Sequence, residues 1–347
     1  MIRNILRCAL HLLSVTMILV LLNSFVLPIS TTERKHRVVV VLECAFGLSN
    51  RLRAYASVAS AVKRYKWELF LVWPKDIHLN SEFLDLFEKP ALVSNIYSSY
   101  EQMRSLLSKS FGNIKWDVYD LTVVYAPGTE LGLPTPVPGS VVYIKSNVRV
   151  VFKDEELQSD SSLCYELQNL KLSKTLHVRY MRTKHRLGDL SGMTGVHIRM
   201  LVNQANDIPG VDKDLLMLSR MNAAKTLESR QSCHYESFAR VFNEILKNDS
   251  KARFLLTTDS HEALINLRVL YGDRILIANE TAHEICSGTA EARNWECLAQ
   301  ALIDQHLLSK TKQFISSTWS SFSEVIKMLG EFQNDKVLQG CGQIRIA

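Results

Sequence analysis

From residue 37 onward the apolar positions of the chain follow a strand, helix, strand pattern. The β-branched run at 37–43 is long enough for one buried strand. Apolar residues then recur at helical spacing over 51–65, which places them on one face of a helix. A second apolar run at 69–73 is ended by Pro74. This pattern predicts a βαβ unit whose strands are parallel and joined by a right-handed crossover.

The second half of the chain shows the same alternation. Its first strand is expected at 195–199, where an apolar run delivers a histidine and an arginine at its carboxyl end. Further helices are expected at 235–246, 260–271, 295–309 and 322–329, and further strands at 254–257, 275–277 and 313–316. Helices and strands in this order predict a second doubly wound sheet.

The stretch between these halves is less regular. Apolar runs and turns mix over 75–140, and the four prolines within 127–138 predict an irregular connection there. We expect one long strand or a strand pair at 141–151, helical pieces over 154–192, and a polar loop at 203–214. The predicted fold class is therefore α/β, with two Rossmann-like domains at 37–190 and 191–347 and a cleft between them.

An apolar segment precedes both halves. Residues 8–27 are almost wholly apolar, and about 20 such residues cross a bilayer as a helix. Arg3 and Arg7 precede them, which places the start of the chain in the cytosol. We expect residues 1–36 to form a cytosolic tail, a signal anchor and a short stem of a single-pass type II protein in the Golgi or ER membrane. A cleaved signal peptide is the alternative, and it also leads to the secretory pathway.

Composition narrows the class of ligand. At 347 residues the chain is longer than one hydrophobic core usually supports, which agrees with two domains. A net charge of +6 suits a nucleotide phosphate or a membrane surface, and no dense basic cluster with interleaved aromatic residues points to nucleic acid. Six cysteines follow the apolar segment, enough for three disulfides whose pairing stays open. None has the close C-x-x-C spacing of a zinc site.

A phosphate-binding edge is predicted in the second half, because crevices form outside the carboxyl ends of parallel strands. Arg199 ends the strand at 195–199 and offers paired donors with a charge that does not titrate. The alternative is a surface ion pair. Ser320 and Ser321 precede the last helix, whose N-terminal amides suit a phosphate, although either serine could be an ordinary helix cap.

Other polar groups fall at matching positions. Thr258 and Asp259 follow the strand at 254–257, and Asp304 lies inside the helix at 295–309. These carboxylates could accept hydrogen bonds from a base amide or a ribose hydroxyl, or serve as a helix cap and a buried amide partner. In the first half, Gly47 and Asn50 lie on the first strand-to-helix loop, where amides face the cleft or simply cap the helix.

Four motifs in order carry a family resemblance. V-H-I-R, then L-L-T-T-D-S, then A-L-I-D-Q-H-L-L-S-K-T-K-Q-F-I-S-S-T-W-S-S-F-S resemble the three motifs shared by α1,6-fucosyltransferases, bacterial Nod-factor fucosyltransferases and protein O-fucosyltransferases. The earlier F-G-L-S-N-R-L-R is similar to the amino-terminal loop of this superfamily. The resemblance implies a GT-B fold, GDP-fucose as co-substrate, a glycan or glycoprotein acceptor, and inversion at the fucose anomeric carbon with no cofactor or metal required.

The resemblance also implies roles for individual residues. Arg199 would hold the donor diphosphate, and His197 would lie beside the fucose or the pyrophosphate. Asp259 and Asp304 would contact the guanosine part, and Ser320 or Ser321 the β-phosphate. Negative charge grows on the leaving GDP as the glycosidic bond breaks, so a fixed guanidinium and helix-end amides would stabilise it.

Departures from the family pattern leave other functions open. Met200 stands where close α1,6 relatives have a second arginine, and Ser260 replaces the second of two paired aspartates. These changes leave the linkage undetermined. The alternatives are a GT-B transferase that uses another nucleotide sugar, since fold does not fix function, and a catalytically silent relative that binds glycan or protein.

The catalytic base has two candidates. Inversion calls for a carboxylate that deprotonates the acceptor hydroxyl. Asp207 on the polar loop and Glu43 at the end of the first strand are the carboxylates we select. For Glu43 the alternative is a structural partner of Arg51 or Arg53.

Overall fold

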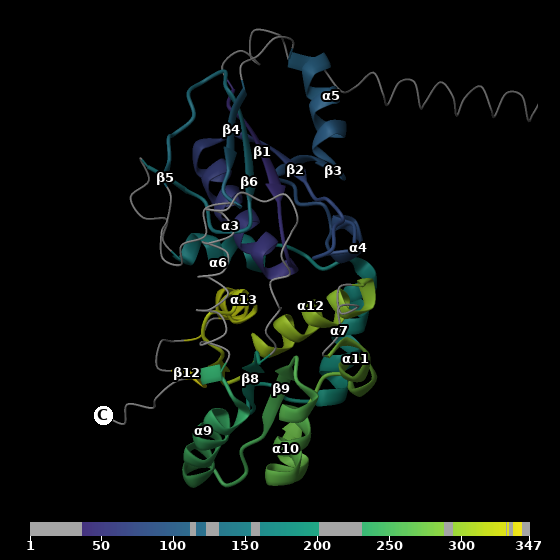
Figure 1. Cartoon of the computed structure of the whole chain (residues 1–347), viewed down its shortest axis with the longest axis vertical. Coiled ribbons are helices and arrows are strands. Elements are labelled where there is room, and N and C mark those ends of the chain that lie inside the picture. The colour runs from purple at the N-terminus through teal and green to yellow at the C-terminus, as the bar shows by residue number, and fades with distance from the viewer. Residues whose placement is uncertain are drawn as a thin grey trace, which may run out of the picture.

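Two parallel five-stranded sheets, each flanked by helices, form the framework of the chain in its computed structural model (Figure 1). The apolar segment 8–27 and Asp207 lie outside the described residues. Within the part of the chain that is described, no helix is both long and apolar enough to cross a membrane. The structure describes residues 37–111, 116–122, 132–153, 160–200, 231–287, 294–330, 332 and 336–341.

The first sheet has the strand order β3-β2-β1-β6-β4, and every neighbouring pair is parallel. The expected βαβ unit is confirmed as β1 (Val39–Cys44), α3 (Leu48–Tyr65) and β2 (Glu68–Val72). The other elements of this half are α4 (Phe83–Leu86), β3 (Val93–Tyr97), α5 (Tyr100–Phe111), β4 (Trp116–Asp120), β5 (Gly132–Leu133), β6 (Val141–Ser146), β7 (Val151–Phe152), α6 (Asp160–Gln168) and α7 (Lys174–Leu187).

Residues 141–151 form two strands instead of one long strand, but the two strands do not pair with each other. β6 ends at Ser146, whose hydroxyl turns back to accept from the Val148 amide at 3.1 Å and donate to the Val148 carbonyl at 2.9 Å. The chain then resumes as β7, which pairs with β5 in a separate two-stranded sheet.

The second sheet has the order β10-β9-β8-β11-β12, again all parallel. Its first strand, β8 (Thr194–Ile198), ends one residue earlier than expected, so Arg199 lies just beyond the ladder. The remaining elements are α9 (Tyr235–Asn248), β9 (Phe254–Thr258), α10 (His261–Tyr271), η1 (Gly272–Arg274), β10 (Ile275–Leu276), α11 (Glu280–Cys286), α12 (Trp295–Leu308), β11 (Gln313–Ser316), α13 (Ser321–Leu329) and β12 (Val337–Gln339).

β1 is a central strand with both of its faces covered. Its six residues are all buried, and successive side chains point to opposite faces of the sheet. Val40 and Leu42 belong to the core cluster that includes α3, whereas Val39 and Val41 pack in a separate cluster with Met103 of α5. A strand covered on both faces reads as a continuous apolar run, which is why its pattern is so clear in the sequence.

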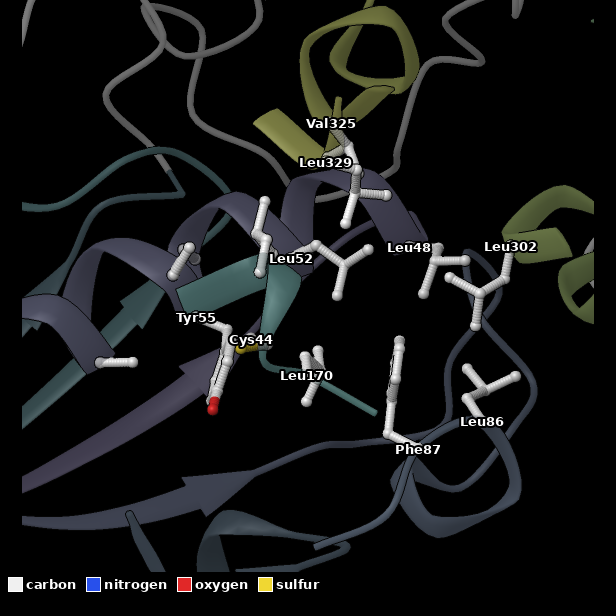
Figure 2. Close-up of a cluster of buried hydrophobic side chains, with 14 of the residues drawn as sticks. Cys44, Leu48, Leu52, Tyr55, Leu86, Phe87, Leu170, Leu302, Val325 and Leu329 are labelled. Atoms are coloured by element: carbon white, nitrogen blue, oxygen red, sulfur yellow. The ribbon is translucent and has the colours of Figure 1, made fainter. Parts of the chain in front are cut away.

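The two sheets share one apolar cluster. Leu48 and Leu52 of α3 lie close to Leu302 of α12 and to Val325 and Leu329 of α13 (Figure 2). These residues come from both halves of the chain, and α13 packs directly on α3 and α6. Burial of apolar surface contributes roughly 25 cal/mol per Å². The two halves are therefore held together by a hydrophobic contact as well as by the covalent chain.

Two disulfides brace the second half. Cys233 is bonded to Cys341, and Cys286 to Cys297, which links the end of α11 to the start of α12. Cys44 and Cys164 are not disulfide-bonded. Burial raises the pKa of the Cys44 thiol to about 12, so this group stays protonated and unreactive. Of the three bridges that six cysteines allow, the structure forms two.

Candidate functional site

His197 and Arg199 are fixed at the carboxyl end of β8 by a serine that the sequence analysis did not select. The Ser317 hydroxyl accepts from the Arg199 amide at 2.9 Å and donates to the His197 carbonyl at 3.0 Å. Ser317 follows β11, the neighbouring strand, and is 2% exposed. One buried hydroxyl thus satisfies two backbone groups beyond the ladder and sets the direction in which Arg199 leaves the sheet.

Arg199 meets Asp259 at the edge of the sheet. An Arg199 Nη1 donates to Asp259 Oδ2 at 2.5 Å, and the Met200 amide donates to Asp259 Oδ1 at 2.9 Å. The Arg199 side chain is 31% exposed and that of Asp259 is 14% exposed. The sheet therefore brings together two residues selected from the sequence. Arg199 and Asp259 form an ion pair with each other, as the alternative interpretation of Arg199 predicts. This pair lies at the carboxyl edge of the sheet, where a ligand would bind.

The neighbouring strand end is shaped by side-chain hydrogen bonds. Thr258 is buried, and its hydroxyl accepts from the Ser260 amide at 3.1 Å. Ser260 caps α10 by accepting from the Ala263 amide at 3.2 Å. The serine that replaces the second aspartate of the family pattern thus takes the cap, and Asp259 stays available to Arg199.

The N-terminus of α13 lies against the end of β8. Ser320 caps this helix, with its hydroxyl accepting from the Ser323 amide, and Ser321 is the first helical residue. Ser323 Oγ lies 2.8 Å from Nδ1 of His197, and both side chains are buried. The ring of His197 also packs on Phe322 with centroids 4.5 Å apart. His197 is thus a buried link between strand and helix.

The N-terminus of α13 and the backbone of Arg199 meet at the same sheet edge. The amides at the start of α13 carry the positive end of the helix dipole. The link between His197 and Ser323 holds this helix start to β8, two positions before Arg199, whose guanidinium is directed to Asp259. Amides at a helix N-terminus and an arginine at the same sheet edge are groups suited to a phosphate or diphosphate.

Asp304 is the carboxylate of this half with the most perturbed pKa. Burial raises its pKa to about 7, against hydrogen bonds from Gln300 and Thr257 that lower it. The Gln300 Nε2 donates to Asp304 Oδ1 at 2.6 Å. This confirms the sequence alternative of a buried amide partner. A carboxyl group poised near pH 7 can also donate a hydrogen bond in its neutral form.

Glu43 has partners other than those expected. Tyr143 donates its hydroxyl to Glu43 Oε2 at 2.7 Å, and Lys145 Nζ lies 3.4 Å from Glu43 Oε1. Pairing of Glu43 with Arg51 or Arg53 is therefore wrong, because cross-strand neighbours on β6 reach the carboxylate first. Its side chain shares the face of Val41 and Tyr143, which is packed by α5, whereas α3 and α13 cover the opposite face.

The first strand-to-helix loop turns at Phe46, whose φ of 64° lies in the left-handed region, directly before the start of α3. Gly47 occupies the cap position of α3, and its carbonyl accepts from the amides of Asn50 at 3.0 Å and Arg51 at 3.2 Å. Arg51 turns inward and donates to Phe46, to Pro74 and, at 2.8 Å, to Asp76. This arginine is fully buried, so its charge serves the fold and not a ligand.

A surface groove lies away from this constellation. It is lined by Arg253, Tyr271, Asp273, Arg274 and their neighbours, around the residues that precede β9 and β10. That is the amino edge of the second sheet, opposite to the strand ends that carry Arg199 and Thr258. Among the described residues, no group of three or more His, Cys, Asp or Glu is arranged to hold a metal ion.

No family model and no curated protein matches the chain by sequence. Several solved structures do match its fold. NodZ α1,6-fucosyltransferase soaked with GDP-fucose aligns over 89% of this chain and 98% of its own, at 16% identity and a TM-score of 0.50. POFUT1 in its apo form aligns over 89% and 99%, at 10% identity and a TM-score of 0.51. POFUT1 in complex with GDP aligns over 88% and 98%, at 10% identity and 0.50.

The chain has the fold of these fucosyltransferases. The expected α/β architecture with two parallel sheets is thereby confirmed as GT-B-like. At 10 to 16% identity the likeness concerns the fold. The roles of individual side chains rest on the geometry described above.

Proposed function

We propose that this protein is a glycosyltransferase that moves fucose from GDP-fucose to a glycan or glycoprotein acceptor with inversion. The observation that carries the proposal is the joining of Arg199 and the N-terminus of α13 at one sheet edge through Ser317 and the His197–Ser323 link. Motif resemblance and fold agree with it, since solved structures of this fold contain GDP-fucose or GDP.

The chemistry divides between leaving group and acceptor. The acceptor oxygen attacks the fucose anomeric carbon, and the bond to the β-phosphate breaks with its electron pair leaving on GDP. Arg199 and the amides of α13 stabilise the charge that develops there, with no metal required in this proposal. Ser320 or Ser321 would contact the β-phosphate, and Asp259 and Asp304 lie on the side proposed for the guanosine.

The base remains a choice between Asp207 and Glu43. The acceptor hydroxyl must lose its proton as it attacks. Glu43 already accepts from Tyr143 and pairs with Lys145, and it lies on the face of the first sheet opposite to α3. These contacts favour a structural role for Glu43, and we propose Asp207 as the base.

We also propose that the chain is a membrane-anchored protein of the secretory pathway. The apolar segment 8–27 would be the anchor, and two disulfides in the second half fit an oxidising compartment. The division into 1–36, 37–190 and 191–347 is supported by the sheets, because each one draws its strands from one side of residue 190.

Calorimetric titration of the protein without residues 1–36 tests which nucleotide sugar it binds as donor. We expect binding of GDP and GDP-fucose in preference to UDP-sugars. Arg199→Ala should weaken it by about 2 kcal/mol or more, roughly 30-fold, because the diphosphate loses a charged donor. A folded protein that prefers a uracil nucleotide would contradict the GDP-fucose assignment.

One observation favours a second candidate, a catalytically silent relative. Arg199 is already paired with Asp259, and Met200 stands where a second arginine would add to the phosphate site. A protein that binds GDP-fucose but neither hydrolyses nor transfers fucose in an acceptor screen would support this candidate.

A further inference from the structure

The first turns of α3 reach across to the helices of the second half. Ser49 accepts from Nε2 of Gln305 on α12 at 2.8 Å, and both side chains are buried. Arg53 forms an ion pair with Glu324 of α13, and its other terminal nitrogen donates to Asn50 at 2.8 Å. Thus three polar residues of one loop and helix, Ser49, Asn50 and Arg53, are engaged at the junction of the two sheets.

Arg53 is held there on two sides. Asn50 lies one turn earlier on the same helix, and Glu324 lies in the first turn of α13. The Arg53 side chain is 14% exposed, whereas Glu324 is 42% exposed. Arg51, two residues earlier, turns inward to Asp76, so it is Arg53 that spans the junction.

The contact between α3 and α13 around this ion pair is apolar, and such a contact does not by itself fix the position of one helix on the other. Leu52 and Leu48 of α3 lie near Val325 and Leu329 of α13 (Figure 2). Apolar contacts stabilise the association but are non-directional. A charge pair with defined geometry selects one register of helix on helix.

Charge gives the pair a second role. Glu324 is the acidic residue in the first turn of α13, close to the helix N-terminus where a diphosphate would bind. A carboxylate there favours the helix but repels a phosphate. The guanidinium of Arg53, which pairs with Glu324, offsets that negative charge.

We infer that Arg53 is a positioning residue for the donor site: with Glu324 it holds the start of α13 in place against α3 and neutralises the carboxylate nearest that helix start. The inference rests on the proposed function, because the ligand concerned is the diphosphate of the donor. Arg53 acts through α13 and touches no reacting atom in this scheme.

A double-mutant cycle measured with GDP tests the inference. Arg53→Gln should raise the Kd for GDP by about fivefold to tenfold, within the range of coupling found for residues in contact. Combining it with Glu324→Gln should cost less affinity than the sum of the two single changes, because both residues act through one ion pair and the double variant has no uncompensated carboxylate. The defect of Arg53→Gln should also shrink in high salt, since Glu324 is exposed enough to be screened. A merely structural loss would not respond in this way.

Arg64→Gln is the matched control, because Arg64 lies exposed in the last turn of the same helix. Arg53→Lys should retain more affinity than Arg53→Gln. If wild type binds GDP and Arg53→Gln behaves like Arg64→Gln, or if the losses of the two single variants add in full in the double variant, the positioning role is wrong. If folded wild type binds no GDP, the proposed function fails, and this role fails with it.

Discussion

The pairing of Arg199 with Asp259 leads to our most specific prediction, the effect of Asp259→Asn. The two oxygens of Asp259 accept from different donors, Oδ2 from the Arg199 side chain and Oδ1 from the Met200 amide. Asparagine keeps an oxygen for the Met200 amide but turns an NH₂ group toward Arg199. Two donors then face each other, and the guanidinium must leave its position.

The magnitude follows from the exposure of the pair. A hydrogen bond between charged groups contributes about 1.5 to 3 kcal/mol when buried. The Arg199 side chain is 31% exposed, so water screens part of this energy and the lower end applies. About 1.5 kcal/mol corresponds to roughly a tenfold loss of affinity for a ligand that needs Arg199 in place.

Calorimetric titration with GDP and UDP measures the effect. If Asp259 orients Arg199, both nucleotides lose affinity by a similar factor. If Asp259 contacts the guanosine, as the family resemblance implies, GDP loses more than UDP. Glu262→Gln is the control, because Glu262 is an exposed carboxylate in the first turn of α10. An Asp259→Asn variant that binds GDP more tightly than wild type would refute the reasoning, since Asp259 would then compete with the diphosphate for Arg199.

Two further predictions concern stability. Burial raises the pKa of Asp304 to about 7 from 3.8, so the folded chain retains a proton that the unfolded chain releases, and stability falls as pH rises from 4 to 7. His306, whose pKa burial lowers to about 4 from 6.5, has the opposite slope over most of that window. Asp304→Asn should therefore gain stability relative to wild type as pH rises to 7, and an unchanged difference in Tm across that range would contradict the assignment. Leu302→Ala should cost about 2 to 5 kcal/mol in urea unfolding, because Leu302 is 1% exposed; Leu270→Ala, at a residue 60% exposed, should change stability by about 0.5 kcal/mol or less.

The sequence predicts strands best where they are buried on both faces. The run that forms β1 is continuous and apolar, whereas β3, with only its two end residues buried, gives no such run and was not predicted. β4 lacks such a run for the same reason, because this edge strand mixes apolar and acidic residues that are half-buried or exposed. A strand can thus be predicted from its local sequence only where the apolar pattern reflects the burial of its residues.

The sequence predicts which residues belong to the candidate site, but not which residues they contact. Arg199, Asp259 and Ser320 were selected because each follows a strand or opens a helix. Their contacts join residues far apart in the chain: Arg199 and Asp259 are separated by 60 positions, and His197 and Ser323 by 126. No local spacing encodes which carboxylate an arginine meets. Ser317 and Ser323 became visible only when the strand ends were brought together.

The apolar contact of α3 with α12 and α13 has a consequence for how this chain can be divided. A fragment that begins after residue 190 would keep its own sheet but present Leu302, Val325 and Leu329 to water without their partners on α3. Such a patch promotes aggregation. The second half is therefore not a transferable module, and a substitution at Leu48 or Leu52 would have to be accommodated by helices more than 240 positions away.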